Sequence, residues 1–184
     1  MTGLLSADRE HLPTWAAERL SDLLGRAPAD PDMSQQQTLV LRHAAGGLIN
    51  AEIAQVMVLS EDTVKSHMRA VFTRLGVRSR TGAFVVGLAR GVIRPGDVVP
   101  AGRIAPSLSA TQALVLLLLA CGLSLQEVAD VADMSLDTVK SHLRVILRRF
   151  GTRWSSHAVA TGISLGLVPV PGLTLPAPTA ARAS

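Results

Sequence analysis

The segment Ser60-Glu61-Asp62-Thr63-Val64-Lys65-Ser66-His67-Met68-Arg69 occurs again 75 residues later as Ser135-Leu136-Asp137-Thr138-Val139-Lys140-Ser141-His142-Leu143-Arg144. Aligning residues 34–92 with residues 109–167 without a gap gives roughly 25 identities over about 59 positions, with glycine and apolar positions in step. A duplicated structural unit explains such a match. Because the shared Lys, Ser, His and Arg are polar while the residues between them are apolar, the duplication has kept a surface as well as a core. We expect the function on that surface.

Positive charge is concentrated in both copies of this segment. The 184-residue chain has a formal net charge of +4. Two stretches without a carboxylate hold much of the basic charge: they contain Lys65, Arg69, Arg74, Arg78 and Arg80 in the first copy, and Lys140, Arg144, Arg148, Arg149 and Arg153 in the second. One such stretch is as readily a solvated helix face as a binding surface. Two matched stretches favour a polyanionic partner.

The composition argues against several classes of protein. Cys121 is the only cysteine and lies in an apolar run, which excludes a disulfide framework and a cysteine-based metal site. The sequence shows no Ser/His/Asp set, paired carboxylates or metal-ligand spacing, so we predict no enzyme, cofactor or metal. The N-terminus lacks a basic leader with a long apolar stretch, and the run 113–123 is about half the length that spans a bilayer. We therefore expect a soluble, cytoplasmic protein without membrane contact.

Helix signals predict two four-helix units preceded by a short helix. Apolar residues at helical spacing, a cap at Thr14 and a stop at Gly25 predict a helix over 14–24. Ser34 and Ser109, each followed three residues later by glutamine, predict capping boxes that open the first helix of each unit. Ile49 stands at the cap position of the second helix in the first unit, so we expect Asn50 to cap that helix instead. Proline and glycine after residue 92 predict a stiff connector. The predicted parts are an N-terminal helix and linker (1–32), a first unit (33–93), a Pro/Gly-rich linker (94–107), a second unit (108–168) and a disordered Pro/Ala-rich tail (169–184).

The third helix of each unit carries the repeated basic surface. It is predicted to begin after Ser60 or Ser135 and to end at Gly76 or Gly151. Apolar residues three and four positions apart turn one face of this helix inward, so the opposite face exposes a lysine, a serine and an arginine in its first turns. A short second helix, a three-residue turn and such a third helix match the layout that enters the major groove of DNA. The predicted fold class is therefore all-α, with two tandem four-helix helix-turn-helix domains.

These side chains have the chemistry that DNA recognition needs. Lys and Arg donate to guanine O6 and N7, Ser donates or accepts, and His and the trailing arginines engage phosphates. The candidate DNA-binding residues are Lys65, Ser66, His67, Arg69, Arg74 and Arg78 in the first unit, and Lys140, Ser141, His142, Arg144 and Arg148 in the second. We interpret Thr63 and Thr138 as helix caps or core hydroxyls, and Glu52 and Glu127 as capping or ion-pairing groups rather than catalytic ones.

Both units resemble the LuxR-type (GerE) helix-turn-helix domain found at the C-terminus of many bacterial transcription regulators. The resemblance covers about two thirds of the chain and is most specific in Asn50-Ala51-Glu52-Ile53-Ala54, in 60–67, and in Leu75-Gly76-Val77-Arg78-Ser79-Arg80 with Ala83. It implies that the third helix reads DNA, that Lys65, Ser66 and Arg69 contact bases or phosphates, and that His67 lies near the backbone. The same roles are implied for Lys140, Ser141, Arg144 and His142, where the same residue types stand.

The second unit departs from the family pattern. The pair Ser79-Arg80 is replaced by Trp154-Ser155, and Asp130 and Asp133 lie on the helix that flanks the groove. We therefore expect weaker DNA binding by the second unit.

Two further expectations concern packing. The fourth helices, about 80–90 and 155–165, are apolar on most sides, and glycine or alanine at 83, 87, 158 and 162 would permit close approach. Members of the resembled family often dimerise through this helix, so we expect the two fourth helices to pack together as a pseudo-dimer.

Leu117 and Leu118 replace Arg42 and His43, and this extra apolar face needs a cover. The cover is either the N-terminal helix or a second copy of the protein.

Only residues 1–32 precede the first unit in this sequence, so we expect no receiver or ligand-binding domain. We predict a bacterial transcription regulator without a recognisable sensor domain that binds double-stranded DNA sequence-specifically through two recognition helices, as a monomeric pseudo-dimer or a homodimer. The alternative is a protein-interaction module, with RNA polymerase or a partner regulator as its target.

Overall fold

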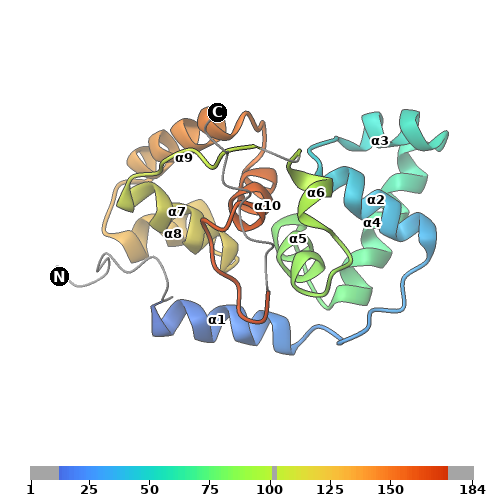
Figure 1. The fold of residues 1–184 in the computed structure, drawn as a ribbon, viewed down its shortest axis with the longest axis horizontal. Coiled ribbons are helices and arrows are strands. Elements are labelled where there is room, and N and C mark those ends of the chain that lie inside the picture. The colour runs from blue at the N-terminus through green and yellow to red at the C-terminus, as the bar shows by residue number, and fades with distance from the viewer. Residues whose placement is uncertain (1–12, 101–102, 174–184) are drawn as a thin grey trace, which may run out of the picture.

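The structure is a computed structural model that describes residues 13–100 and 103–173. Within these residues it contains ten α-helices and no strand, which confirms the predicted all-α class. The first repeat contributes the helices on one side of the molecule and the second repeat those on the other, with α5 and α10 between them (Figure 1). The helices are α1 (Thr14–Gly25), α2 (Gln35–Ala45), α3 (Asn50–Met57), α4 (Glu61–Leu75), α5 (Arg80–Ala89), α6 (Pro95–Val98), α7 (Ala110–Ala120), α8 (Leu125–Ala132), α9 (Leu136–Phe150) and α10 (Ser155–Ser164).

Side-chain caps begin most of these helices where the sequence predicts them. The N–H of Gln37 donates to Ser34 Oγ at 3.2 Å, and the N–H of Ser34 donates to Gln37 Oε1 at 3.0 Å. Ser109 and Gln112 repeat this capping box at the start of α7. These reciprocal bonds satisfy backbone donors that have no partner inside a helix.

Two predicted caps are wrong. The N-cap of α1 is Pro13 rather than Thr14, because Thr14 is already the first helical residue. The N-cap of α3 is Ile49 rather than Asn50. Ile49 has no side-chain acceptor, but its N–H donates to Glu52 Oε2 at 2.8 Å, which retains half of a capping box. Asn50 is thereby left free for a different contact.

One face of α4 and of α9 forms the core of its repeat. Both helices end at a glycine in the left-handed conformation, with φ of 66° at Gly76 and 63° at Gly151. The buried residues recur at spacings of three and four: Val64, Met68, Val71 and Leu75 on α4, and Val139, Leu143, Ile146 and Phe150 on α9. Because this stripe is buried, the polar residues between its members lie on the outer face of each helix.

Helices α5 and α10 pack directly against each other, which confirms the predicted contact between the fourth helices. In addition, α10 contacts α2 of the other repeat, and α5 contacts α7. In both cases the fourth helix of one repeat contacts the first helix of the other repeat. Such reciprocal contacts are typical of a two-fold interface between identical subunits. Phe84 on α5 and Val159 on α10 are among the fully buried residues of this region, and each such side chain contributes about 1.5–3 kcal/mol when it leaves water.

The glycines of the fourth helices serve a purpose other than the predicted one. A Cβ atom at Gly87 would lie 2.7 Å from Ile93 Cδ1 and 3.3 Å from Leu41 Cδ2, and one at Gly162 would lie 2.5 Å from Leu116 Cδ2. All these neighbours belong to the same repeat as the glycine. The glycines therefore make room for the first helix of their own repeat rather than for the opposite fourth helix. Gly87 also makes room for Ile93, which follows the end of α5.

Helices α1 and α6 make equivalent contacts with the two repeats. Helix α6 contacts α2 and α10, whereas α1 contacts α7 and α5. On α2, Arg42 forms an ion pair with Asp97 of α6 at 3.4 Å. At the equivalent position Leu117 is buried, and α1 supplies the buried Leu20. The apolar face of α7 is thus covered by α1 within the same chain.

The connector and the C-terminal segment differ from their predictions. The connector between the repeats, predicted only as a stiff linker, includes the single turn α6, which begins with Pro95 at a position where proline needs no partner for its missing N–H. Helix α6 packs on both repeats, against α2 of the first and α10 of the second. The predicted disordered tail begins at 169, yet Val170 is buried; residues 174–184 of that tail lie outside the described residues.

Candidate nucleic-acid interface

Each repeat contains a helix, a tight turn and a second helix in the same local geometry. After α3 the chain reverses through Val58, which has φ of 54°, and after α8 it reverses through Asp133, which has φ of 53°. Ser60 Oγ then accepts the N–H of Thr63 at 3.0 Å, and Ser135 Oγ accepts that of Thr138 at 3.1 Å. The threonine hydroxyls also bond to these serines, at 2.8 Å in both repeats. Thr63 and Thr138 therefore complete the caps of α4 and α9, as predicted.

The predicted reading face of α4 lies on the surface. Ser66 and Arg69 are exposed and His67 is half-buried. Lys65 Nζ lies 3.0 Å from Asp62 Oδ1, and its side chain remains 45% exposed. An ion pair this exposed contributes about 0–1 kcal/mol, so Lys65 can leave Asp62 for a stronger anionic partner.

The predicted reading face of α9 repeats that of α4. Ser141 and Arg144 are exposed and His142 is half-buried. Lys140 Nζ lies 3.5 Å from Asp137 Oδ1. Among the described residues no carboxylate lies within ion-pair distance of Arg69 or its equivalent Arg144. Asp62 and Asp137, which pair with these lysines, were not among the candidate residues predicted from the sequence. The presence of aspartate at this position in both repeats was the signal that could have identified them.

Two trailing arginines brace the segment that leads into their repeat. Arg74 Nη1 lies 3.0 Å from Asp32 Oδ2, and Arg149 donates to the carbonyl of Ser107. Asp32 and Ser107 stand at equivalent positions, so this contact has been duplicated with the repeat. Arg74, a predicted DNA contact, thus already has an acidic partner. Arg78 and Arg148 are exposed, and within the described part of the chain neither lies close enough to a carboxylate to form an ion pair.

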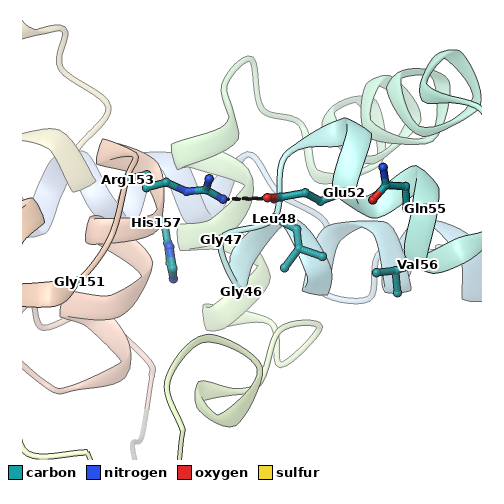
Figure 2. A pocket seen from close by; sticks show the side chains of 9 residues that line it. All are labelled: Gly46, Gly47, Leu48, Glu52, Gln55, Val56, Gly151, Arg153 and His157. Atoms are coloured by element: carbon teal, nitrogen blue, oxygen red, sulfur yellow. Dashed lines mark hydrogen bonds and ion pairs between the residues drawn. The ribbon is translucent and has the colours of Figure 1, made fainter.

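A pocket of about 480 Å³ lies at the junction of the two repeats (Figure 2). Arg153, from the turn before α10, reaches across it and donates to both carboxylate oxygens of Glu52 on α3, at 3.0 and 3.3 Å. The bond from the Ile49 N–H, followed by that from Arg153, lowers the pKa of Glu52. Arg153 belongs to the second basic stretch, but its guanidinium is paired with Glu52 of the first repeat. The assignment of Glu52 as a capping and ion-pairing residue is confirmed.

Helix α10 presents His157 to the same pocket. A Cβ atom on Gly47 of the first repeat would lie only 2.5 Å from Cε1 and Nδ1 of the His157 ring. Burial lowers the pKa of His157, a hydrogen bond with the backbone of Val98 opposes this effect, and the charges of Arg103 and Arg153 add to it. The ring is therefore a neutral packing element between the repeats.

Other kinds of site find little support in the part of the chain that the structure describes. Burial raises the pKa of the Cys121 thiol to about 11, so it is a poor nucleophile at neutral pH. Within residues 13–100 and 103–173 no three His, Cys, Asp or Glu side chains gather closely enough to hold a metal ion. None of the described helices combines the length and apolar character that a membrane span requires.

The fold and its two exposed basic helices define a tandem helix-turn-helix protein. The sequence profile described as "Bacterial regulatory proteins, luxR family" matches residues 31–86 and 106–161. The two matches cover more than half of the chain and coincide with the two repeats. The chain therefore belongs to the luxR family of bacterial regulatory proteins.

Several curated proteins are similar to one repeat's length of the chain. The HTH-type transcriptional regulator AlkS of Pseudomonas putida is 41% identical over 61 residues, which are 33% of this chain and 7% of AlkS. The transcriptional regulatory protein LnrK of Bacillus subtilis is 36% identical over 61 residues, 33% of this chain and 28% of LnrK. The nitrate/nitrite response regulator protein NarP of Escherichia coli is 41% identical over 56 residues, 30% of this chain and 26% of NarP. The chain thus spans between 7% and 28% of the length of these relatives. No solved structure matches it.

Proposed function

We propose that this protein binds double-stranded DNA sequence-specifically through α4 and α9 and acts as a bacterial transcription regulator. The observation that carries the proposal is the duplicated outer face of these two helices, where a lysine, a serine and an arginine are accessible at equivalent positions. Arg69 and Arg144 are exposed and have no carboxylate within ion-pair distance among the described residues, which suits the phosphate backbone, and polar groups in the first turns of a helix suit base edges. Membership of the luxR family supports the same function.

The packing of α5 on α10 favours a single chain that acts as its own pseudo-dimer. Cross-contacts that exchange between the repeats support a two-fold relation of the two reading helices. Such a relation matches inverted half-sites in DNA, with centres about one helical turn apart. A footprint over an inverted repeat, with one chain bound per duplex by light scattering, is the expected result. Protection of direct repeats would contradict this arrangement.

Paired substitutions test DNA binding and the contribution of each repeat. A duplex selected from a random library is titrated with the wild type, with Lys65→Ala/Arg69→Ala and with Lys140→Ala/Arg144→Ala, at several salt concentrations. We expect both variants to bind more weakly. The slope of log K against log salt is negative, and each lost phosphate contact should lower its magnitude by about 0.9. The first variant should lose more, because the exposed Asp130 and Asp133 lie beside the second reading helix. Affinity that neither variant changes would refute the proposal, and equal losses would remove the ranking.

One observation favours a protein contact as a second candidate function. Val56 on α3 and Val131 on α8 stand at equivalent positions and are 58% and 48% exposed, although both are apolar. An exposed apolar residue kept in both repeats suits a protein partner, with RNA polymerase as the proposed target. Val56→Ser/Val131→Ser should then leave DNA affinity unchanged but reduce binding of purified RNA polymerase to the DNA-bound protein. Unchanged polymerase binding would exclude this role.

A further inference from the structure

A positively charged hollow of about 280 Å³ lies beside the reading helix of the first repeat. It is bordered by the start of α3, one side of α4 and the start of α5, and its lining comprises Asn50, Lys65, Met68, Arg69, Phe72 and Arg80. Three of these residues are cationic and none is acidic. Since a water molecule takes up about 30 Å³ in the liquid, a tetrahedral oxyanion fits within this space.

Arg80 is the most buried of the three cations that line the hollow. Its Nη2 donates to Asn50 Oδ1 at 2.7 Å, and among the described residues no carboxylate lies within ion-pair distance of its guanidinium. Burial removes water from this group and lowers the pKa of Arg80. A desolvated cation that has a neutral hydrogen-bond partner but no counter-ion favours the arrival of an anion. The bond to Asn50 also fixes the direction of the guanidinium before any ligand binds.

The second repeat has no equivalent of this arrangement. Asn50 and Arg80 correspond to Leu125 and Ser155, so the fixed donor and the group that orients it are both missing. Lys140 and Arg144 remain at the positions of Lys65 and Arg69. The two repeats therefore share their reading residues but differ in this flanking pair.

We propose that the hollow binds a backbone phosphate of the DNA strand beside the groove that α4 enters, with Arg80 as its fixed donor and Asn50 as the residue that positions it. This inference rests on the DNA-binding function proposed above. It deepens that function by making the first repeat the one that anchors the protein on DNA. The second repeat reads its half-site without this anchor.

Exchange of the differing residues between the repeats tests the proposal on the full chain. Binding to the selected duplex is measured by fluorescence anisotropy over a range of salt concentrations. Arg80→Ser should weaken binding about 10- to 100-fold, as expected for one charge-assisted hydrogen bond. It should also lower the magnitude of the salt slope, which is the slope of log K against log salt, by about 0.9. Arg80→Lys should keep the slope. Leu125→Asn/Ser155→Arg should raise its magnitude by a similar amount, because it supplies the second repeat with the missing pair.

Controls separate loss of the phosphate contact from loss of structure. Arg94→Ser removes the same charge from the exposed start of α6 and should leave the slope unchanged. Thermal unfolding of each variant reports its stability, since a purely structural role for Arg80 would reduce the folded fraction without altering the slope of the folded protein. Inorganic phosphate, compared with chloride at equal ionic strength, should compete with DNA more strongly for the wild type than for Arg80→Ser.

The outcomes distinguish this inference from the proposed function. If the wild type binds DNA with a salt dependence that Arg80→Ser leaves intact, the phosphate site is refuted and the DNA-binding function stands. If the wild type binds no duplex even at low salt, the proposed function itself fails. Competition by free phosphate without any change in the DNA salt slope would also overturn the assignment, because the hollow would then take a free anion rather than the DNA backbone.

Discussion

Gly47→Ala should destabilise the protein through a contact between the repeats. Gly47 has φ of 99°, a conformation that costs a residue with a Cβ atom about 1–2 kcal/mol. The added Cβ would also lie 2.5 Å from the His157 ring, and such overpacking costs about 1–3 kcal/mol. The sum is about 2–5 kcal/mol. For a chain of this length about 2–4 °C of melting temperature corresponds to each kcal/mol, so we expect a decrease of about 4–20 °C.

Gly122 provides a matched control, because it occupies the equivalent position in the second repeat. Its φ is 84°, but a Cβ atom there would meet no neighbour within 4 Å. Gly122→Ala should therefore cost only the backbone strain, about 2–8 °C. The assay is differential scanning calorimetry of both variants in the wild-type and His157→Ala backgrounds. Removal of the ring should reduce the cost of Gly47→Ala to that of Gly122→Ala. Equal costs in the wild-type background would refute the contact between Gly47 and His157.

Two further predictions concern His157 and Val58. Burial holds the pKa of His157 below its ordinary value of 6.5. At a pH between the pKa of the folded state and that of the unfolded state, the unfolded chain therefore binds more protons than the folded one. Stability should therefore fall as the pH drops below about 6.5, and urea titrations from pH 7.5 to 5 should show a smaller decrease in His157→Gln; parallel pH profiles would contradict the burial of this ring. Val58 is a β-branched residue in the left-handed conformation and is 90% exposed. Val58→Asn should raise the melting temperature by about 2–4 °C, equivalent to about 1 kcal/mol, whereas Asp133→Asn should change it little; a lower melting temperature for Val58→Asn would show that the valine side chain has a stabilising contact.

The local parts of this fold could be predicted from the sequence because local chemistry determines them. Ser34 with Gln37, the apolar stripe of α4 and the stop at Gly76 each depend on residues within one or two helical turns. The outer face of α4 follows directly from that stripe. The same local reasoning fails at Ile49, because a backbone N–H that bonds to Glu52 replaces the expected side-chain cap.

Contacts between distant residues could not be predicted in this way. The Glu52–Arg153 pair joins residues that are 101 positions apart, and no periodicity or motif links them. The bond between Asn50 and Arg80 spans 30 positions, so its two members were visible only as separate matches to a family pattern. The apolar surfaces of the fourth helices and the family resemblance predicted that these helices meet, but nothing in the sequence indicated that α1 would make the contacts equivalent to those of α6. Such contacts depend on how finished helices fit together.

The packing of α5 on α10 within one polypeptide has a consequence for how occupancy of a DNA target depends on gene dosage. A regulator that must first associate from two separate chains fills its target roughly with the square of its concentration when it is scarce. Under the function proposed above, this chain already holds both reading helices. The second helix is then always present at a high effective concentration, and occupancy of the target rises in direct proportion to the concentration of the protein. The proposal therefore implies that halving the number of molecules in the cell halves occupancy instead of reducing it to a quarter.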